Sequence, residues 1–320
     1  MSAAVITDLG GGVRRVTQPL PWALDHVHCY VVDGADGVTL IDAGLGTPGT
    51  ERRWREALVA LGSPTVAQVI VTHYHPDHLG CSAALVELCG AGRLLQGAHD
   101  WALTPIAFGD AGEPGSFLRH LLRLGMPDDL ARDSATEEDA LPIRFSTPSK
   151  LLEEGDAVDL AGETFRVLRL PGHADGHIAL YAEHSGRMFG GDVLLEEITP
   201  NVGLWEDTTS GDPVADYLAS LTRIEELAPA VVYPGHRRVV ERPADRAREI
   251  RDHHARRLDV HEEALRAGAA TPYEVALRVF GERLGLHERR FALVETAAHL
   301  VRLAGLGRAR ETAPYHYAPG

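Results

Sequence analysis

Three histidines and an aspartate lie within the six-residue segment His73-Tyr74-His75-Pro76-Asp77-His78, directly after an apolar stretch. Imidazole and carboxylate groups are the usual protein ligands of zinc and similar divalent ions. In an extended turn His73 and His75 point to the same side, so one ion can bind both. Asp77 and His78 belong to the next turn and can face a second ion. A His-rich surface loop would not account for this abrupt change from strand to cluster, so the segment predicts a metal site.

Three more residues of ligand type occur later in the chain, each beside glycine and each after an apolar stretch. They are His173 in Pro171-Gly172-His173, Asp192 in Gly190-Gly191-Asp192 and His236 in Pro234-Gly235-His236. Glycine allows the sharp, closely approaching backbone that a convergent metal site needs. We therefore expect these residues to join the first group.

Such a ligand set predicts hydrolytic chemistry. Two neighbouring cations lower the pKa of a water that they share, which provides a hydroxide near neutral pH. A hydroxide of this kind attacks a carbonyl carbon or a phosphorus, while a cation stabilises the charge that develops on the substrate oxygen. Asp77 can orient the nucleophile and pass a proton to the leaving group. The sequence shows no pattern typical of a serine or cysteine nucleophile.

Strands and helices alternate in the part of the chain that carries these residues. Runs rich in β-branched residues predict strands at residues 26–33, 38–42, 66–72, 164–170, 178–181, 187–189 and 230–233. Capping residues and apolar spacing predict helices at residues 48–61, 79–90 and 212–227. This alternation indicates sheets covered by helices, with the chemistry on loops at strand ends.

Two segments depart from this order. Residues 98–150 contain an apolar helix at 117–124, an acidic run at 128–139 and several prolines. We interpret them as a helical insertion, either a lid or an ordinary surface excursion. Beyond residue 242 the strand patterns stop, and helices are predicted at 243–268, from 271 onward and at 288–303. The predicted domains are therefore a catalytic domain over residues 1–242 and a helical module over residues 243–320, with residues 313–320 as a loose tail.

Charge and composition limit the class of protein. The chain has 320 residues, with 31 basic and 46 acidic residues and a net charge of −15. The segment from Arg237 onward has 16 arginines and 12 acidic residues, so it carries +4 and the remainder carries −19. An acidic body repels polyanions, which disfavours nucleic acid as a partner there. Three cysteines, no apolar run of membrane-spanning length and no signal-peptide pattern predict a cytoplasmic protein without disulfides.

Histidines outside the motifs are not expected to bind metal. We expect His177 to support its neighbour His173. His26 and His28 are assigned to a strand, with a place at the border of the cleft as the alternative. His253, His254 and His261 are assigned to the solvated face of an Arg-rich helix.

The ordered motifs HxHxDH, GHxxGH, GD and PGH resemble those of the metallo-β-lactamase superfamily, and more closely its glyoxalase II-like hydrolases. The resemblance spans roughly residues 12–240 and implies an α+β fold, the four-layer αββα sandwich. It implies two divalent metal ions, preferably zinc, with iron or manganese as alternatives. The implied ligands are His73, His75 and His173 for the first ion, Asp77, His78 and His236 for the second, and Asp192 between both. Asp42 matches a supporting aspartate of the family.

One departure from the antibiotic-hydrolysing members concerns the second ion. Many of those members have a cysteine among its ligands, whereas the matching position here is Asp192. Antibiotic hydrolysis is therefore not expected as the main role. The segment after Thr271-Pro272 is similar to a winged-helix-like appendage on some of these hydrolases. Some relatives with that appendage act on RNA, which keeps a nucleic-acid role of the C-terminal module open.

The main hypothesis is a dinuclear metal-dependent hydrolase that cleaves an ester, thioester or lactone of a small molecule through a metal-bridging hydroxide. A metal-dependent endoribonuclease or phosphodiesterase is the first alternative. A mononuclear iron enzyme of the persulfide dioxygenase type is the second, and a non-catalytic binding protein is the third. We expect a small-molecule substrate and no membrane partner, and a homodimer remains open.

Overall fold

Two β-sheets face each other in the computed structural model, which describes residues 5–109 and 111–320. The first sheet has seven strands in chain order: β1 (Val5–Gly10), β2 (Val13–Pro19), β3 (His26–Val32), β4 (Val38–Ile41), β5 (Val66–Val71), β6 (Leu94–Gly97) and β7 (Lys150–Leu152). The second has five strands in the order β12-β11-β10-β9-β8: β8 (Ala157–Leu160), β9 (Glu163–Arg169), β10 (Ile178–Tyr181), β11 (Arg187–Gly191) and β12 (Val231–Pro234). The β-branched runs form the buried central strands, as strands covered on both faces require.

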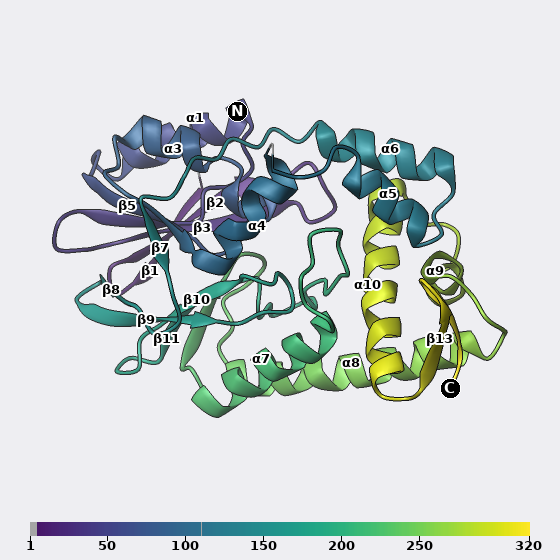
Figure 1. The fold of residues 1–320 in the computed structure, drawn as a ribbon. Coiled ribbons are helices and arrows are strands. Elements are labelled where there is room, and N and C mark those ends of the chain that lie inside the picture. Colours follow the sequence, from purple (N-terminus) through teal and green to yellow (C-terminus); the bar gives the residue numbers. More distant parts are fainter. Residues whose placement is uncertain (1–4, 110) are drawn as a thin grey trace.

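Helices cover the outer face of each sheet (Figure 1). The first sheet is covered by α1 (Pro48–Ala60), α2 (Pro76–Leu79) and α3 (Ser82–Cys89), and the second by α7 (Pro213–Leu227) and α8 (Pro243–Leu265). Three apolar clusters fill the gaps: Trp54 and Leu85 against the first sheet, Ile70 with Phe165 between the sheets, and Tyr217 with Ile250 against the second. The predicted four-layer αββα sandwich is confirmed.

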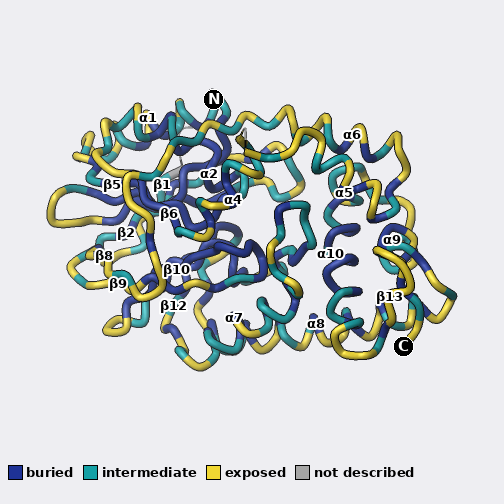
Figure 2. Tube along the Cα trace, in the orientation of Figure 1, coloured by how far each residue is buried: buried dark blue, intermediate teal, exposed yellow. Residues whose placement is uncertain are grey.

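The later part of the insertion and the C-terminal helices pack against each other beside the sandwich, whereas the first helix of the insertion packs on β6 and β7 of the first sheet. The insertion contains α4 (Ala98–Phe108), α5 (Ser116–Arg123) and α6 (Asp128–Asp139), and the C-terminal part continues with α9 (Pro272–Phe280), α10 (Leu286–Gly305), β13 (Ala309–Ala313) and β14 (His316–Pro319). Leu121 and Leu124 share an apolar cluster with Leu293 and Val294 of α10. Figure 1 shows α10 running from α5 and α6 to α8, and Figure 2 shows that much of it is buried.

The end of the chain is not the loose tail that its composition predicts. Strand β14 pairs antiparallel with β13, and Tyr317 in this hairpin is buried. Tyr317 and Ala270 exchange two backbone hydrogen bonds of 2.9 Å. The Tyr317 ring packs into an apolar cluster and so holds a hairpin whose neighbouring residues are mainly polar. No helix within the described residues is both long enough and apolar enough to cross a membrane.

The prediction that the histidines of α8 are solvated is wrong for two of them. His254 and His261 are buried, and the ring of His299 from α10 stacks between them, with centroid distances of 5.3 and 4.8 Å. Nδ1 of His254 lies 3.1 Å from Nε2 of His299. The arginines of α8 lie mainly on its exposed face, whereas these histidines lie on the face that packs against α10. We call His254, His299 and His261 the histidine stack.

Candidate metal centre

Strands that run in the same direction bring the candidate ligands to one edge of the two sheets. Strands β4 and β5 are parallel, and Asp42 and His73 follow their ends. In the second sheet β9, β11 and β12 share one direction, because β10 is antiparallel to β9 and β11, and β12 is parallel to β11. His173, Asp192 and His236 follow these three strands. The topology therefore explains why residues distant in the sequence meet.

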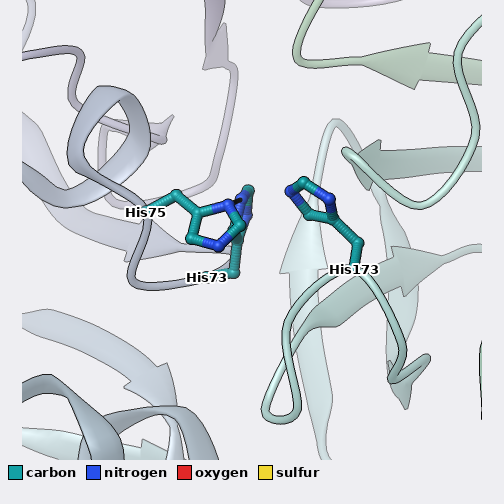
Figure 3. A group of neighbouring side chains, drawn as sticks. All are labelled: His73, His75 and His173. Atoms are coloured by element: carbon teal, nitrogen blue, oxygen red, sulfur yellow. Dashed lines mark hydrogen bonds between the residues drawn. The ribbon is translucent and has the colours of Figure 1, made fainter. Parts of the chain in front are cut away.

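Three histidines form the first group. His73 and His75 come from the loop after β5, and His173 approaches them from the second sheet (Figure 3). Their ring centroids are 4.4 to 5.0 Å apart, and one nitrogen of each lies within 4.8 Å of the others. Nε2 of His73 lies 3.1 Å from Nδ1 of His75. This spacing suits three ligands around a single ion.

The second group adds carboxylates. Nε2 of His236 lies 3.2 Å from Oδ2 of Asp77 and 3.1 Å from Oδ2 of Asp192. Nε2 of His78 lies 3.4 Å from Oδ1 of Asp192 and 3.9 Å from Oδ2 of Asp77. Oδ2 of Asp192 also lies 3.7 Å from Nε2 of His173, so this carboxylate touches both groups. The structure thus brings all seven predicted side chains together around two adjacent points.

The imidazoles are held from behind, which fixes their free nitrogens. Nδ1 of His78 donates to the Asp42 carboxylate at 2.8 Å. Nδ1 of His173 donates to the Asn201 carbonyl at 2.8 Å, and Nδ1 of His236 donates to the His26 carbonyl at 2.7 Å. Each Nε2 then presents a lone pair to the centre. These three Nε2 atoms and Oδ1 of Asp192 are buried and make no hydrogen bond within the chain. Buried polar atoms seldom lack a partner, and this donor set fits divalent cations.

Asp42 organises the base of the centre. Its carboxylate accepts hydrogen bonds from the backbone N–H of Thr72 (2.8 Å) and from the Thr72 hydroxyl (3.0 Å), besides the one from His78. The Thr72 oxygen then accepts from Nδ1 of His73 at 3.0 Å. Asp42 has a φ of 61°, a conformation uncommon for a residue other than glycine. Such backbone strain clusters at functional sites.

Sequence reasoning missed several supports of the centre. The carbonyl groups of Asn201 and His26 leave no signal in the sequence, because any residue can supply them. Thr72 could have been noticed from its position directly before the first histidine. His177, which we expected to be a supporting residue, is buried, and the contact that the sequence did not indicate is the hydrogen bond that its Nε2 accepts from the Asp192 backbone N–H at 3.1 Å. His28 is also buried, and its Nε2 lies 2.8 Å from the Arg237 carbonyl.

Burial and charge divide the histidines into two electrostatic classes. Burial lowers the pKa of His73 and of His173, so both rings are neutral at pH 7. Burial also opposes charge on His236, yet the carboxylates of Asp192 and Asp77 raise the pKa of that ring to about 10. The two carboxylates therefore favour positive charge at the second group, and a metal cation can supply it.

Glycine is required where the backbone passes close to the ligands. A Cβ at Gly235 would overlap Oδ1 of Asp192 and come within 2.5 Å of Cε1 of His78. A Cβ at Gly191 would lie 2.7 Å from Nε2 of His177, and this residue has a φ of 48°. Any larger residue at either position would displace the side chains that surround Asp192.

A cavity of about 590 Å³ opens onto the centre. His75 of the first group and His236 of the second group line this cavity. The cavity extends between the insertion and the C-terminal helices, where Phe117 and Phe291 form part of its lining. Apolar side chains dominate this lining, and carboxyl groups occur at a few places. A space of this size accommodates a small organic molecule.

Comparisons with known proteins agree with this geometry. A family model described as the metallo-beta-lactamase superfamily matches residues 22–236. The Bacillus subtilis protein named "Probable metallo-hydrolase YqjP" is 32% identical over 90% of this chain and 91% of its own length. The acyl-coenzyme A thioesterase MBLAC2 of Gallus gallus is 28% identical over 71% of this chain and 78% of its own.

A solved structure resembles the whole chain. The metallo-beta-lactamase family protein TTHA1429 from Thermus thermophilus superposes with a TM-score of 0.86 at 33% identity, covering 98% of this chain and 100% of its own. The agreement therefore includes the insertion and the C-terminal helices. The extent of these matches, together with the four-layer fold, shows that the chain belongs to the metallo-beta-lactamase superfamily and is a metal-dependent hydrolase.

Proposed function

We propose that the centre holds two divalent metal ions, preferably zinc. The proposed ligands are His73, His75 and His173 for the first ion, Asp77, His78 and His236 for the second, and Asp192 between them. The observation that carries this proposal is the set of buried Nε2 atoms and the Asp192 oxygen that face one another without hydrogen bonds. Imidazole and carboxylate together are ligands that zinc accepts, although iron and manganese also bind to them.

The proposed reaction is hydrolysis of a thioester, with esters and lactones as related substrates. When bound, two such ions lower the pKa of a water molecule and polarise a carbonyl group. The Asp77 side chain is 12% exposed and lines the cavity, so it can orient the attacking water and carry a proton to the leaving group.

Two observations favour a thioester among carbonyl substrates. The similar protein MBLAC2 is named as an acyl-coenzyme A thioesterase. The cavity beside the centre is mainly apolar, which suits an acyl group better than a phosphodiester backbone. The proposal therefore places the acyl group in the cavity and the scissile carbonyl at the centre.

The test compares two substitutions of the same kind. Asp192→Asn keeps the shape of the side chain and removes the charge between the two groups. Asp159→Asn makes the same change at an exposed residue of β8. With zinc-loaded protein and an acyl thioester, we expect Asp192→Asn to lose at least about 100-fold in kcat, in line with removal of an electrostatic catalytic group. Asp159→Asn should retain the activity of the unmodified chain.

Two outcomes would overturn the proposal. One is full thioesterase activity in Asp192→Asn. The other is cleavage of single-stranded RNA, but of no thioester, by the zinc-loaded protein. The second outcome would favour the phosphodiesterase alternative, especially if added salt weakened the activity.

A further inference from the structure

Five aromatic rings follow one another along the cavity. The ring of Trp22 stacks on His287 with a centroid distance of 5.6 Å and an angle of 12° between the ring planes. His287 lies 4.7 Å from Phe291, which lies 5.4 Å from Trp205. Trp205 lies 6.4 Å from Phe117. We call these five residues the aromatic wall.

The aromatic wall is assembled from four separate parts of the chain. Trp22 precedes β3, Phe117 lies in α5, Trp205 lies in the loop before α7, and His287 and Phe291 lie in α10. All five side chains line the cavity and are only half-buried. Phe117 and Trp205 also pack against the apolar cluster beside α10, but the part of each ring that faces the cavity presents apolar surface to a ligand.

A buried arginine holds the wall in place. The guanidinium of Arg290 lies 5.7 Å from the ring centre of Phe117 and 5.6 Å from that of Phe291. Its Nη1 lies 3.0 Å from Oε2 of Glu138 in α6, and Nη2 lies 3.2 Å from Nδ1 of His287. The insertion and α10 are thereby joined behind the rings. A wall fixed in this way loses little conformational freedom when a ligand binds.

Carboxyl groups restrict the charge of the ligand. Glu206 and Asp207 follow Trp205 and line the same cavity, and Glu138 lies on its other side. Arg290 is already paired with Glu138, so it does not offset the other two carboxyl groups. Burial raises the pKa of Glu206 to about 8 and that of Asp207 to about 6, so it is Asp207 that carries the charge at pH 7 and would repel an acyl group with its own carboxylate.

We propose that the aromatic wall binds the acyl group of the substrate and selects bulky, uncharged acyl groups that carry an aromatic ring. This inference rests on the proposed thioesterase function. An aromatic ligand gains offset or edge-on stacking with these rings in addition to burial of its apolar area. A short acyl group has no ring to stack on the wall, and a flexible chain would gain burial without stacking.

The kinetic test uses thioesters of one thiol, N-acetylcysteamine, with acetyl, octanoyl and 2-naphthoyl groups. We expect kcat/KM for naphthoyl to exceed that for octanoyl by about tenfold, as one or two ring contacts imply, and to exceed that for acetyl by more. Phe291→Leu and Trp205→Leu should lower the naphthoyl value about fivefold and the octanoyl value by less, because leucine keeps an apolar contact but cannot stack. Phe145→Leu is the matched control, because Phe145 packs on Trp101 outside the cavity.

A binding measurement separates this inference from the proposed function. Calorimetry with zinc-loaded protein compares 2-naphthoate with octanoate, which present the same carboxylate to the centre. We expect naphthoate to bind more tightly, and Phe291→Leu to remove most of that difference. If naphthoate binds in this way but no thioester is cleaved, the inference about the wall stands and the proposed function fails. Equal affinities of the two acids, or a preference unchanged in Phe291→Leu, Trp205→Leu and Phe117→Leu, would overturn the inference.

Discussion

The metal centre and the aromatic wall share one cavity but are built in different ways. The ligands of the centre lie on loops that directly follow strands, and a hydrogen bond from behind holds His78, His173 and His236. The rings of the wall come from loops and helices far apart in the chain and are held by one another and by Arg290 behind them. Residues near the centre are buried, whereas those of the wall keep part of their surface open to the cavity.

We therefore expect the metal centre to determine the chemistry and the aromatic wall to determine which substrates are preferred. The backbone around the centre allows a single arrangement, so a small change there should abolish the reaction. The wall consists of many weak contacts, so a change there should alter preference among substrates and preserve the chemistry. Substitutions in each region test this distinction.

The largest expected effect follows from adding one methyl group beside the centre. In Gly235→Ala the new Cβ collides with Asp192 and His78, and both ligands must move. Misplacement of catalytic groups by about 1 Å costs about 100-fold in rate, so kcat/KM should fall at least that far. The control is Gly211→Ala, where a Cβ meets nothing within 4 Å. Equal activity of the two variants would show that the centre is not held rigidly.

A smaller effect is expected at Asp42, which is not a proposed ligand but accepts a hydrogen bond from the proposed ligand His78. In Asp42→Asn one carboxylate oxygen is replaced by an NH2 group, which donates and does not accept. Either the Thr72 N–H or Nδ1–H of His78 must then face this NH2 group and lose its hydrogen bond. Loss of such a supporting carboxylate lowers metal affinity by about 10- to 100-fold. Competition with a zinc-binding dye would measure this change. Unchanged zinc affinity would mean that Asp42 does not set the tautomer of His78.

The smallest effect concerns the histidine stack, which supports α10 and therefore the wall. Burial lowers the pKa of His261 from 6.5 to about 3. Below pH 6.5 the unfolded chain binds a proton at this ring that the folded chain does not, so stability falls as the pH falls toward 3. Above pH 6.5 the ring is neutral in both states and contributes no pH dependence.

The variant His261→Leu removes this titration. Between about pH 6 and pH 4, the free energy of unfolding of the unmodified chain should fall by about 1.4 kcal/mol per pH unit more than that of the variant. Urea unfolding of metal-free protein at a series of pH values measures the slope, and His184→Leu in an exposed turn serves as the control. Parallel pH profiles of His261→Leu and the unmodified chain would contradict the assignment of a buried neutral ring.

Local patterns revealed the alternation of strands and helices and the motif residues, whereas the four-layer arrangement followed from the resemblance to the metallo-β-lactamase superfamily. Apolar runs such as residues 66–71 form strands wherever they are buried, and the motif histidines follow these strands directly. The hairpin of β1 and β2 escaped prediction because its arginines interrupt the alternation of apolar residues. Helix α4 was missed as well, since Pro105 lies within it.

The aromatic wall and the histidine stack could not be predicted for a different physical reason. Trp22 and His287 are separated by most of the chain, and nothing in the sequence near either residue indicates the other. The arginines around His254 and His261 predicted a solvated helix, because composition does not distinguish the face that packs from the face that does not. Both features depend on how α10 packs between the insertion and α8.

The most direct test of the account counts metal ions by elemental analysis of the zinc-loaded chain and of His78→Ala. His78 belongs to the second proposed group, and the three histidines of the first group are retained in the variant. We expect two zinc ions per unmodified chain and one in His78→Ala. One ion per chain in both proteins would contradict a dinuclear centre, and a single iron in the protein as purified would favour the mononuclear iron alternative.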